Sequence, residues 1–196
     1  MPVASPKPEF DNAAWVTIPT QLDAHTLYQF CLNPEKLFRL NPYLKIFHWQ
    51  AIGNDVDVHW QNHSDGEMRE VKTRLLIEIK EQELCVHYQA GIKQASYFII
   101  EPNNKVADLI IVDRYASDVA DENPQVDKSI HVWGEALNRF FKHYKYLRRL
   151  PLMEKVIDHF WIKLSPMARR ITYILFVITL VEMVALMLLV LAILMK

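Results

Sequence analysis

The feature that most limits what this chain can fold into is an apolar run near its C-terminus. Between Ile171 and Met195 the only polar or amphipathic residues are Thr172, Tyr173, Thr179 and Glu182. A helix rises about 1.5 Å per residue, so this run would be roughly 37 Å long, enough to cross a hydrocarbon layer of about 30 Å. We therefore expect a transmembrane helix over residues 171–195. Because only Lys196 follows it, we expect a single-pass, tail-anchored membrane protein.

Basic residues just before this run predict its orientation. Residues 139–170 hold 9 Lys and Arg against 2 Asp and Glu, whereas residues 1–138 hold 12 against 20. Positively charged flanks stay on the cytoplasmic side of a membrane, so the N-terminal domain is expected in the cytoplasm. The residues expected at the membrane surface are Arg148, Arg149, Lys155, Trp161, Lys163, Arg169 and Arg170.

Residues 151–170 form a basic, amphipathic juxtamembrane segment bounded by Pro151 and Pro166. Its apolar members are Leu152, Val156, Ile157, Phe160, Trp161 and Leu164. This pattern favours a short helix that lies among the lipid headgroups. The alternative is a helix that packs on the protein's own domain.

Glu182 lies close to the middle of the expected membrane helix. An ionised side chain there would cost at least about 2.5 kcal/mol, so the carboxyl is either protonated or partnered. One hypothesis is an intramembrane contact with another helix, or with a polar lipid or quinone headgroup. The other is a single carboxyl tolerated in a very apolar helix.

The rest of the sequence indicates a domain in a reducing compartment. Residues 1–12 are rich in proline and polar residues, lack the apolar core of a secretory signal, and are expected to be flexible. Cys31 and Cys85 are far apart, each within an apolar stretch, and we expect two free, buried thiols.

Residues 13–150 predict one domain that begins with a strand and two short helices. A strand is expected over Ala14–Ile18 and a helix from the Thr20–Asp23 capping residues through Leu32; a second helix, containing Phe38, ends at Asn41-Pro42. Alternation then predicts six strands at Leu44–Ile52, Asp55–Asn62, Met68–Lys80, Glu83–Ala90, Gln94–Glu101 and Val106–Tyr115. The separators have hairpin length, which makes neighbouring strands antiparallel.

A long helix is expected over Val126–Leu150, after an acidic loop. Its large apolar residues recur at three- and four-residue spacings and form a stripe that needs a concave sheet to cover it. Gly134 sits in that stripe, where a missing side chain would let another backbone or a ligand come close. The fold class is therefore α+β, with the order β-α-α-β6-α.

This order resembles the helix-grip fold of the SRPBCC/START-like superfamily, which includes START lipid-transfer domains, polyketide cyclases and the birch-pollen-allergen proteins. The local pattern that carries the resemblance is Asn33-Pro34-Glu35-Lys36-Leu37-Phe38-Arg39-Leu40-Asn41-Pro42. It is similar to the family's segment in which a short helix after an Asx-Pro pair closes one end of a cavity. The resemblance implies a curved seven-stranded antiparallel sheet around the long helix and an apolar ligand cavity between them.

A sheet with one apolar face laid over an aromatic-rich helix either packs solid or leaves an elongated pocket. The candidate lining residues are Val58, Trp60, Leu75, Ile77, Val86, Tyr88, Tyr97, Ile99, Leu109, Ile111, Trp133, Leu137 and Phe141. For each of them, ordinary core packing is the alternative interpretation. Alternation does not fix the inner face where both faces are partly apolar, as from Arg74 to Ile79 and from Ala107 to Val112.

The sequence predicts no catalytic residue, metal site or cofactor. His59 and His63 share one face of a strand with Asp57, which indicates the solvent side and offers no third ligand. Asp108 and Asp113, with Arg114, interrupt an apolar strand; they place a charge in the cavity mouth or are simply solvated at an edge.

Three functions remain open. The first is a membrane-tethered binding or transfer module for a hydrophobic small molecule such as a lipid, isoprenoid or quinone. The second is an accessory subunit of a membrane complex that meets partner helices through Glu182. The third is a cyclase-like enzyme, which would need a buried acid or base. Nucleic acid is not an expected partner, because the body is acidic and its basic cluster adjoins the membrane run.

Overall fold

The computed structural model describes residues 12–64, 68–116 and 124–195. Its elements are β1 (Ala13–Leu22), α1 (Ala24–Cys31), α2 (Pro34–Arg39), β2 (Leu44–Ile52), β3 (Asp55–Asn62), β4 (Arg69–Lys80), β5 (Glu83–Tyr88), β6 (Lys93–Asn103), β7 (Val106–Tyr115), α3 (Pro124–Leu147), α4 (Pro151–Val156), the π-helical turn η1 (Ile157–Trp161) and α5 (Pro166–Leu194). The expected flexible segment, residues 1–12, lies outside the described residues except for Asn12.

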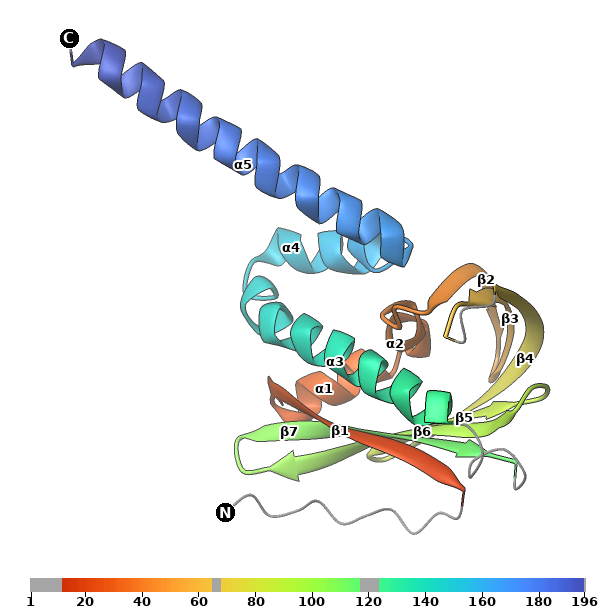
Figure 1. Ribbon diagram of the computed structural model, residues 1–196. Helices are drawn as coiled ribbons and strands as arrows, with labels where there is room; N and C mark the ends of the chain where they lie inside the picture. Colours follow the sequence, from red (N-terminus) through yellow and green to blue (C-terminus); the bar gives the residue numbers. More distant parts are fainter. Residues whose placement is uncertain (1–11, 65–67, 117–123, 196) are drawn as a thin grey trace.

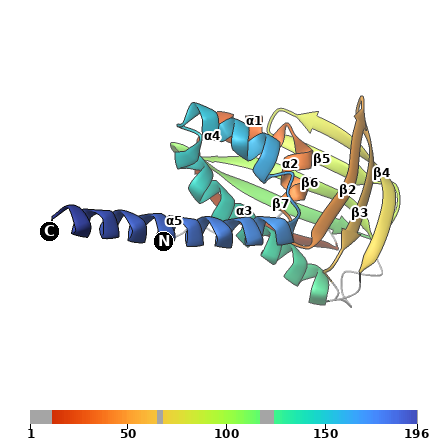
Figure 2. The same cartoon turned by 90° about the horizontal axis from the view of Figure 1, so that it is seen from above.

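The seven strands form one antiparallel sheet in the order β1-β7-β6-β5-β4-β3-β2. Each of β2 to β6 pairs with the next strand along the chain, and β1 pairs with β7. The sheet curls strongly along β2, β3 and β4, and α3 runs across its concave side (Figures 1 and 2). This is the expected α+β helix-grip architecture.

The first strand is longer than the sequence predicts. We expected it to end at Ile18 and the next residues to cap a helix, but β1 continues to Leu22. The Thr20 hydroxyl is buried and donates to the Ala107 carbonyl of β7 at 2.6 Å. The register shifts between Pro19 and Leu22, where Gln21 has a φ of 57°. This bulge turns the chain before Asp23 caps α1 through the Thr26 backbone amide at 2.9 Å.

The aromatic-rich stripe of α3 faces the sheet, as the spacing predicts. Its buried members in the described part of the helix are Ile130, Trp133, Leu137, Phe141 and Tyr144. Gly134 explains how closely α3 approaches the sheet, because a Cβ at this position would lie 2.8 Å from a Val16 methyl carbon of β1. The missing side chain therefore serves a helix–strand contact.

The juxtamembrane segment has two faces. Ile157 and Ile162 are buried in the domain core, as in the alternative interpretation in which this segment packs on the protein's own domain. Leu152, Val156 and Phe160 are exposed. The extra residue of a π-helical turn rotates the helix surface, and η1 falls where the segment changes from its exposed face to its packed face.

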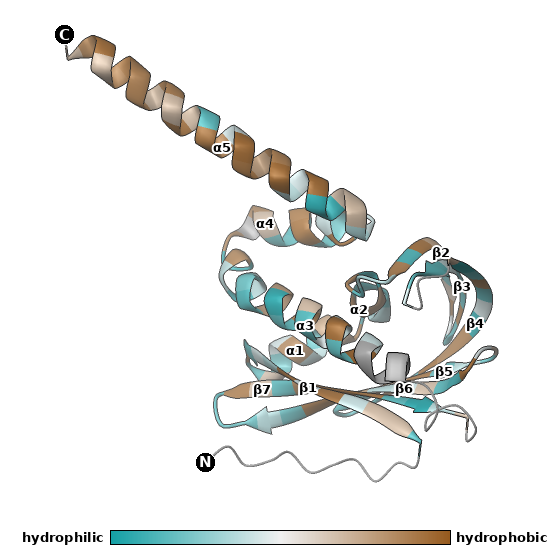
Figure 3. Cartoon of the chain, viewed as in Figure 1, coloured by the Kyte–Doolittle hydropathy of each residue, from teal (hydrophilic) through white to brown (hydrophobic). Residues whose placement is uncertain are grey.

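Helix α5 projects away from the body and carries a nearly continuous apolar surface (Figure 3). It spans 29 residues and is long and apolar enough to cross a membrane by length and composition. Its N-terminus is capped by Ser165, whose side chain accepts from the Ala168 amide.

Candidate functional site

The interior between the sheet and α3 is built around the ring of Phe38, which comes from α2. Five aromatic side chains surround this ring with centroid distances of 5.6–6.4 Å: Trp49, Trp60, Tyr88, Phe98 and Trp133. We call these five residues the aromatic box. They come from β2, β3, β5, β6 and α3. Trp60 is stacked on Phe38 with an interplanar angle of 14°.

Helix α2, which supplies Phe38, is a short unit separate from the frame of the box. It has six residues and lies between Asn33-Pro34 and Asn41-Pro42. Pro34 fits the first turn of a helix, whereas Pro42 is poorly compatible with its continuation. The Trp133 indole N–H donates to the Leu37 carbonyl of α2 at 3.1 Å. The box residues thus hold α2 through their contacts with the Phe38 ring and through this hydrogen bond.

A buried polar cluster lies on the same inner face of the sheet. Asp113 of β7 is fully buried, and its carboxylate accepts hydrogen bonds from Lys93 and Ser96. Lys93 is one-quarter exposed, and its ammonium lies over the rings of Tyr115 and Trp133 at 5.9 and 5.8 Å. The pair therefore sits beside the aromatic box.

The hydrogen bonds of this cluster have a direction. Ser96 has one hydroxyl hydrogen, which it donates to the Asp113 carboxylate. The Tyr88 hydroxyl, 2.9 Å from the Ser96 oxygen, must then be the donor in that bond. Burial, and secondarily the nearby Asp113 charge, raises the pKa of Tyr88 well above its usual value. Tyr88 thus stays a neutral hydroxyl whose own lone pairs remain available as acceptors.

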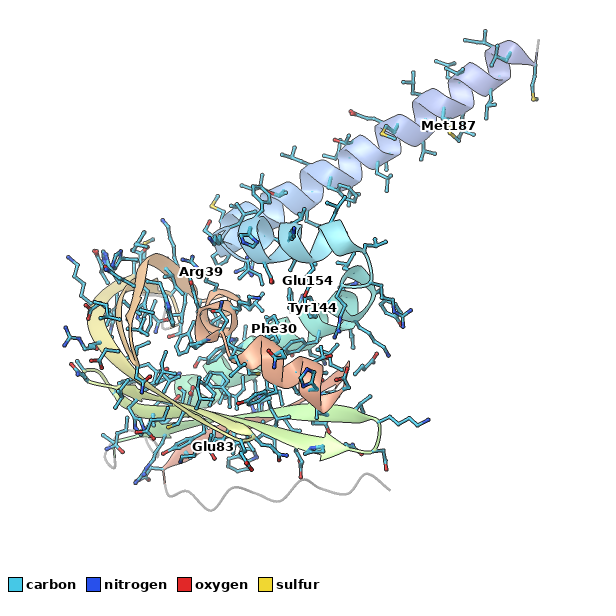
Figure 4. All side chains as sticks on the ribbon, turned by 180° about the vertical axis from the view of Figure 1, so that it is seen from behind. Phe30, Arg39, Glu83, Tyr144, Glu154 and Met187 are labelled. Carbon is cyan, nitrogen blue, oxygen red and sulfur yellow. The ribbon has the colours of Figure 1, made fainter. Side chains whose placement is uncertain are left out.

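A second group of rings fills the opposite end of the interior. Phe30 of α1 contacts Phe140, Phe141 and Tyr144 of α3 at centroid distances of 5.1–5.5 Å. Figure 4 shows Phe30 and Tyr144 on neighbouring helices beneath α4. Burial raises the pKa of Tyr144 to about 12.

Side chains occupy this interior closely. A void of about 10 Å³, no more than the room for one water molecule, lies between α1 and the sheet. It is lined by Tyr28, Cys31, Leu32, Ile79, Glu83, Leu84 and Ile100. The elongated pocket suggested by the sequence is thus, in this conformation, the space taken by Phe38 and the rings around it.

Most of the predicted lining residues do lie on the inner face. These are Val58, Trp60, Leu75, Ile77, Val86, Tyr88, Leu109, Ile111, Trp133, Leu137 and Phe141. The prediction is wrong for Tyr97 and Ile99, because the inner face of β6 carries Phe98 and Ile100. The run Tyr97–Ile100 is apolar throughout, so alternation gives no signal, and the register with β5 and β7 decides the face.

The structure assigns no chemical role to the two cysteines or to the strand histidines. Burial raises the pKa of the Cys31 thiol to about 12 and that of Cys85 to about 11, so both stay protonated. His59 pairs with Glu70, and the neighbouring Asp57 accepts from Arg74 at 2.8 Å. These two pairs lie on the solvent side of the sheet.

Five of the seven residues expected at the membrane surface are exposed: Arg148, Arg149, Lys155, Lys163 and Arg170. Trp161 is half-buried, and Arg169 turns toward the body. The Arg169 guanidinium donates to the Arg39 carbonyl at the end of α2 at 2.5 Å. Lys36 of α2 pairs with Asp158 of η1 at 2.7 Å. The juxtamembrane segment therefore holds α2 from the side opposite the aromatic box.

Comparison with known proteins supports the fold alone. The sequence matches no protein-family model and no curated protein. A START superfamily protein from Mycobacterium smegmatis superposes with a TM-score of 0.52 at 14% identity, over 67% of this chain and 97% of that protein. A protein from Nitrosomonas europaea gives a TM-score of 0.50 at 8% identity, over 68% of this chain and 96% of its own.

The body has the helix-grip fold of the START superfamily. Within the START-like body, Asp113 is the buried acid that the sequence left undecided between a cavity mouth and a solvated edge. Its signal in the sequence was a carboxylate that interrupts an apolar strand. Phe38 and Phe98 of the interior were not among the predicted lining residues.

Proposed function

We propose that this protein is a membrane-tethered module that binds or transfers a hydrophobic small molecule, such as a lipid, isoprenoid or quinone. The observation that carries the proposal is the aromatic box. Its rings belong to the sheet and α3, whereas Phe38, the ring that they enclose, belongs to the short helix α2. A ligand enters by taking the place of Phe38. Without ligand, the Phe38 side chain keeps water out of the box.

The contacts of α2 support entry from the membrane side. Lys36 binds Asp158 of η1, and the Arg39 carbonyl binds Arg169, which lies just before the apolar part of α5. Asp158 Oδ1 and Arg169 Nε are buried without a hydrogen-bond partner. An unpaired buried polar atom costs about 1–3 kcal/mol, so this contact is weaker than its two hydrogen bonds suggest. It is a suitable place for α2 to part from the juxtamembrane segment.

The membrane part of the proposal rests on α5 and the residues before it. A helix of this length and hydropathy is stable across a bilayer. The exposed Leu152, Val156 and Phe160 would then face the headgroup region, while the exposed basic residues meet anionic lipids. Tethering favours transfer because a ligand crosses only a short aqueous gap between bilayer and box.

Lipid extraction from the purified full-length chain, followed by mass spectrometry, tests the proposal. Boundary lipids around α5 are the main background, so the matched control is residues 151–196 fused to an unrelated soluble protein. We expect one class of hydrophobic molecule to be enriched in the full-length sample, approaching one molecule per chain. Identical lipid profiles in the two samples would contradict the proposal.

Glu182 favours a second candidate, an accessory subunit of a membrane complex. Its side chain is exposed on α5, in the middle of an apolar helix that has no buried residue in the described chain. A carboxyl at this depth is stabilised by a polar partner on another helix. Purification in mild detergent should then recover partner proteins that are lost on Glu182→Leu and retained on Leu180→Ala. Equal recovery with both variants would count against this role.

A further inference from the structure

The aromatic box already holds a ring, and that ring belongs to the protein. Phe38 is fully enclosed, with Trp60 stacked on one side and the other four rings of the box tilted around it. Flat π-systems favour such offset-stacked and tilted arrangements over unordered contact. A saturated chain would fill the same volume without using this geometry.

The box also contains a polar group that would lose its partner if α2 left. The Trp133 indole N–H donates to the Leu37 carbonyl, next to Phe38 in the sequence. A buried N–H without an acceptor is unfavourable, so the molecule that replaces Phe38 must supply an acceptor oxygen near Trp133. An unsubstituted hydrocarbon ring does not satisfy this requirement.

We propose that the aromatic box is a ring-binding site for a ligand whose head is a flat aromatic or quinonoid ring bearing a carbonyl or hydroxyl oxygen. The ligand ring occupies the position of the Phe38 ring, and its oxygen accepts from the Trp133 indole N–H in place of the Leu37 carbonyl. This inference rests on the proposed function and narrows its ligand to one class. Phe38 acts as an internal competitor that the ligand displaces.

Fluorescence quenching of the full-length chain in detergent tests the site, because three of the five tryptophans, Trp49, Trp60 and Trp133, belong to the box. The probe is tetramethyl-1,4-benzoquinone, a flat ring with two carbonyl oxygens that quenches indole on contact. Phe38→Ala removes the internal competitor. We expect the variant to bind the probe at least about tenfold more tightly than the wild type, since a competitor that occupies the site reduces apparent affinity.

The matched control is Phe30→Ala, which removes another buried ring of the same core; this ring lies against Phe140, Phe141 and Tyr144 at the other end of the interior. We expect no gain in affinity for the probe. Phe38→Leu is the second variant if Phe38→Ala does not fold, and it should show a smaller gain in the same direction. An equal gain in Phe30→Ala and the Phe38 variants, or no gain in any of them, overturns the inference.

Competition defines the ligand class. Toluene is flat but has no oxygen, and 4-methylcyclohexanone has the oxygen but is not flat. Each should displace the quinone from the wild-type chain, in which Phe38 and the Leu37 carbonyl must both give way, at least about tenfold less effectively than 4-methylphenol, a difference of about 1.4 kcal/mol. Equal displacement by all three overturns the ring assignment. If lipid extraction enriches a ligand but the quinone fails to bind, the proposed function is supported and the ring-binding site is contradicted. If neither assay detects binding, both proposals fail.

Discussion

Lys36 of α2 and Asp158 of η1 form an ion pair with a 2.7 Å separation, although they are 122 positions apart in the sequence. Their side chains are 18% and 21% exposed. This pair joins the helix that carries Phe38 to the turn that precedes α5. Together with the hydrogen bond from Arg169 to the Arg39 carbonyl, it connects the aromatic box to the candidate membrane anchor.

Removing the positive partner should loosen α2. Lys36→Met leaves Asp158 partly buried without a cation, and we expect the free energy of unfolding to fall by about 1–3 kcal/mol. Because the contact is local, amide hydrogen exchange in α2 should accelerate more than exchange in β6 or β7. Chemical unfolding in detergent and hydrogen-exchange mass spectrometry measure the two effects.

The control for this pair is Lys80, which contacts Glu83 at 3.8 Å and is 62% exposed. Lys80→Met should change stability by less than about 0.5 kcal/mol, as expected for a surface ion pair. The double variant Lys36→Met/Asp158→Leu should recover part of the loss, because no unpaired charge remains. Exchange in α2 that is unchanged by Lys36→Met would contradict the proposed connection.

Gly134 should not tolerate even a methyl group. Alanine is the better helix former by about 1 kcal/mol, yet its Cβ would lie 2.8 Å from Val16. We expect Gly134→Ala to destabilise the protein by about 1–3 kcal/mol through overpacking, measured by urea unfolding. Glu135→Ala, at the next, exposed position, provides the control.

Shortening the facing side chain tests this explanation. In the Val16→Ala background the added methyl group has room, so Gly134→Ala should cost less there than in the wild type, by about 1 kcal/mol or more. An equal cost in both backgrounds would show that Val16 is not the obstacle.

Local patterns predicted the strands well where turn chemistry bounded them. The observed bounds of β2, β3 and β7 coincide with the predicted ones, because Gly53-Asn54 and Asn104-Lys105 are short hairpin turns with few alternative registers. The long helix was also predicted, because its stripe recurs over many turns. Its apolar spacing does not reveal which residues it meets.

Features that depend on several strands or on distant contacts could not be read from the sequence. In β6 the pairing with two neighbours, rather than the apolar run itself, turns Phe98 inward and Tyr97 outward. The role of Phe38 depends on five rings from five elements. Asp113 was visible as an interruption in an apolar strand, but only the sheet register places Lys93 and Ser96 beside it.

The buried thiol of Cys31 should make stability depend on alkaline pH. Its folded pKa of about 12 lies above the ordinary value of 9.0, because burial disfavours the thiolate. The contribution is complete below pH 9 and is lost as the pH rises from about 9 to 12, since only the unfolded chain ionises in that range. At pH 10 the loss should be about 1.4 kcal/mol.

Urea midpoints measured between pH 8 and pH 10.5 test this effect against Cys31→Ala. The variant should be less stable at pH 8 because it loses packed volume, but its stability should decline less steeply above pH 9. Parallel pH profiles for the two proteins would rule out Cys31 as the source. Any common decline would then be attributed to Cys85 and Tyr144, whose pKa values are raised to about 11 and about 12.

Variants of the Asp113–Lys93 pair distinguish a structural role of this pair from a role in ligand binding. Asp113→Ala leaves Lys93 without its carboxylate in a mostly buried site, and breaking such a pair should cost about 3 kcal/mol or more. Replacing both residues by apolar ones, as in Asp113→Leu/Lys93→Met, removes the unpaired charge and should restore stability to within about 1 kcal/mol of the wild type.

If the pair serves folding alone, ligand enrichment in the lipid-extraction assay recovers together with stability. We expect the opposite, a double variant that is stable but no longer enriches the ligand, because the pair orients Ser96 and Tyr88 at the edge of the aromatic box. Ligand enrichment at the wild-type level in the stable double variant would show that this cluster plays no part in binding.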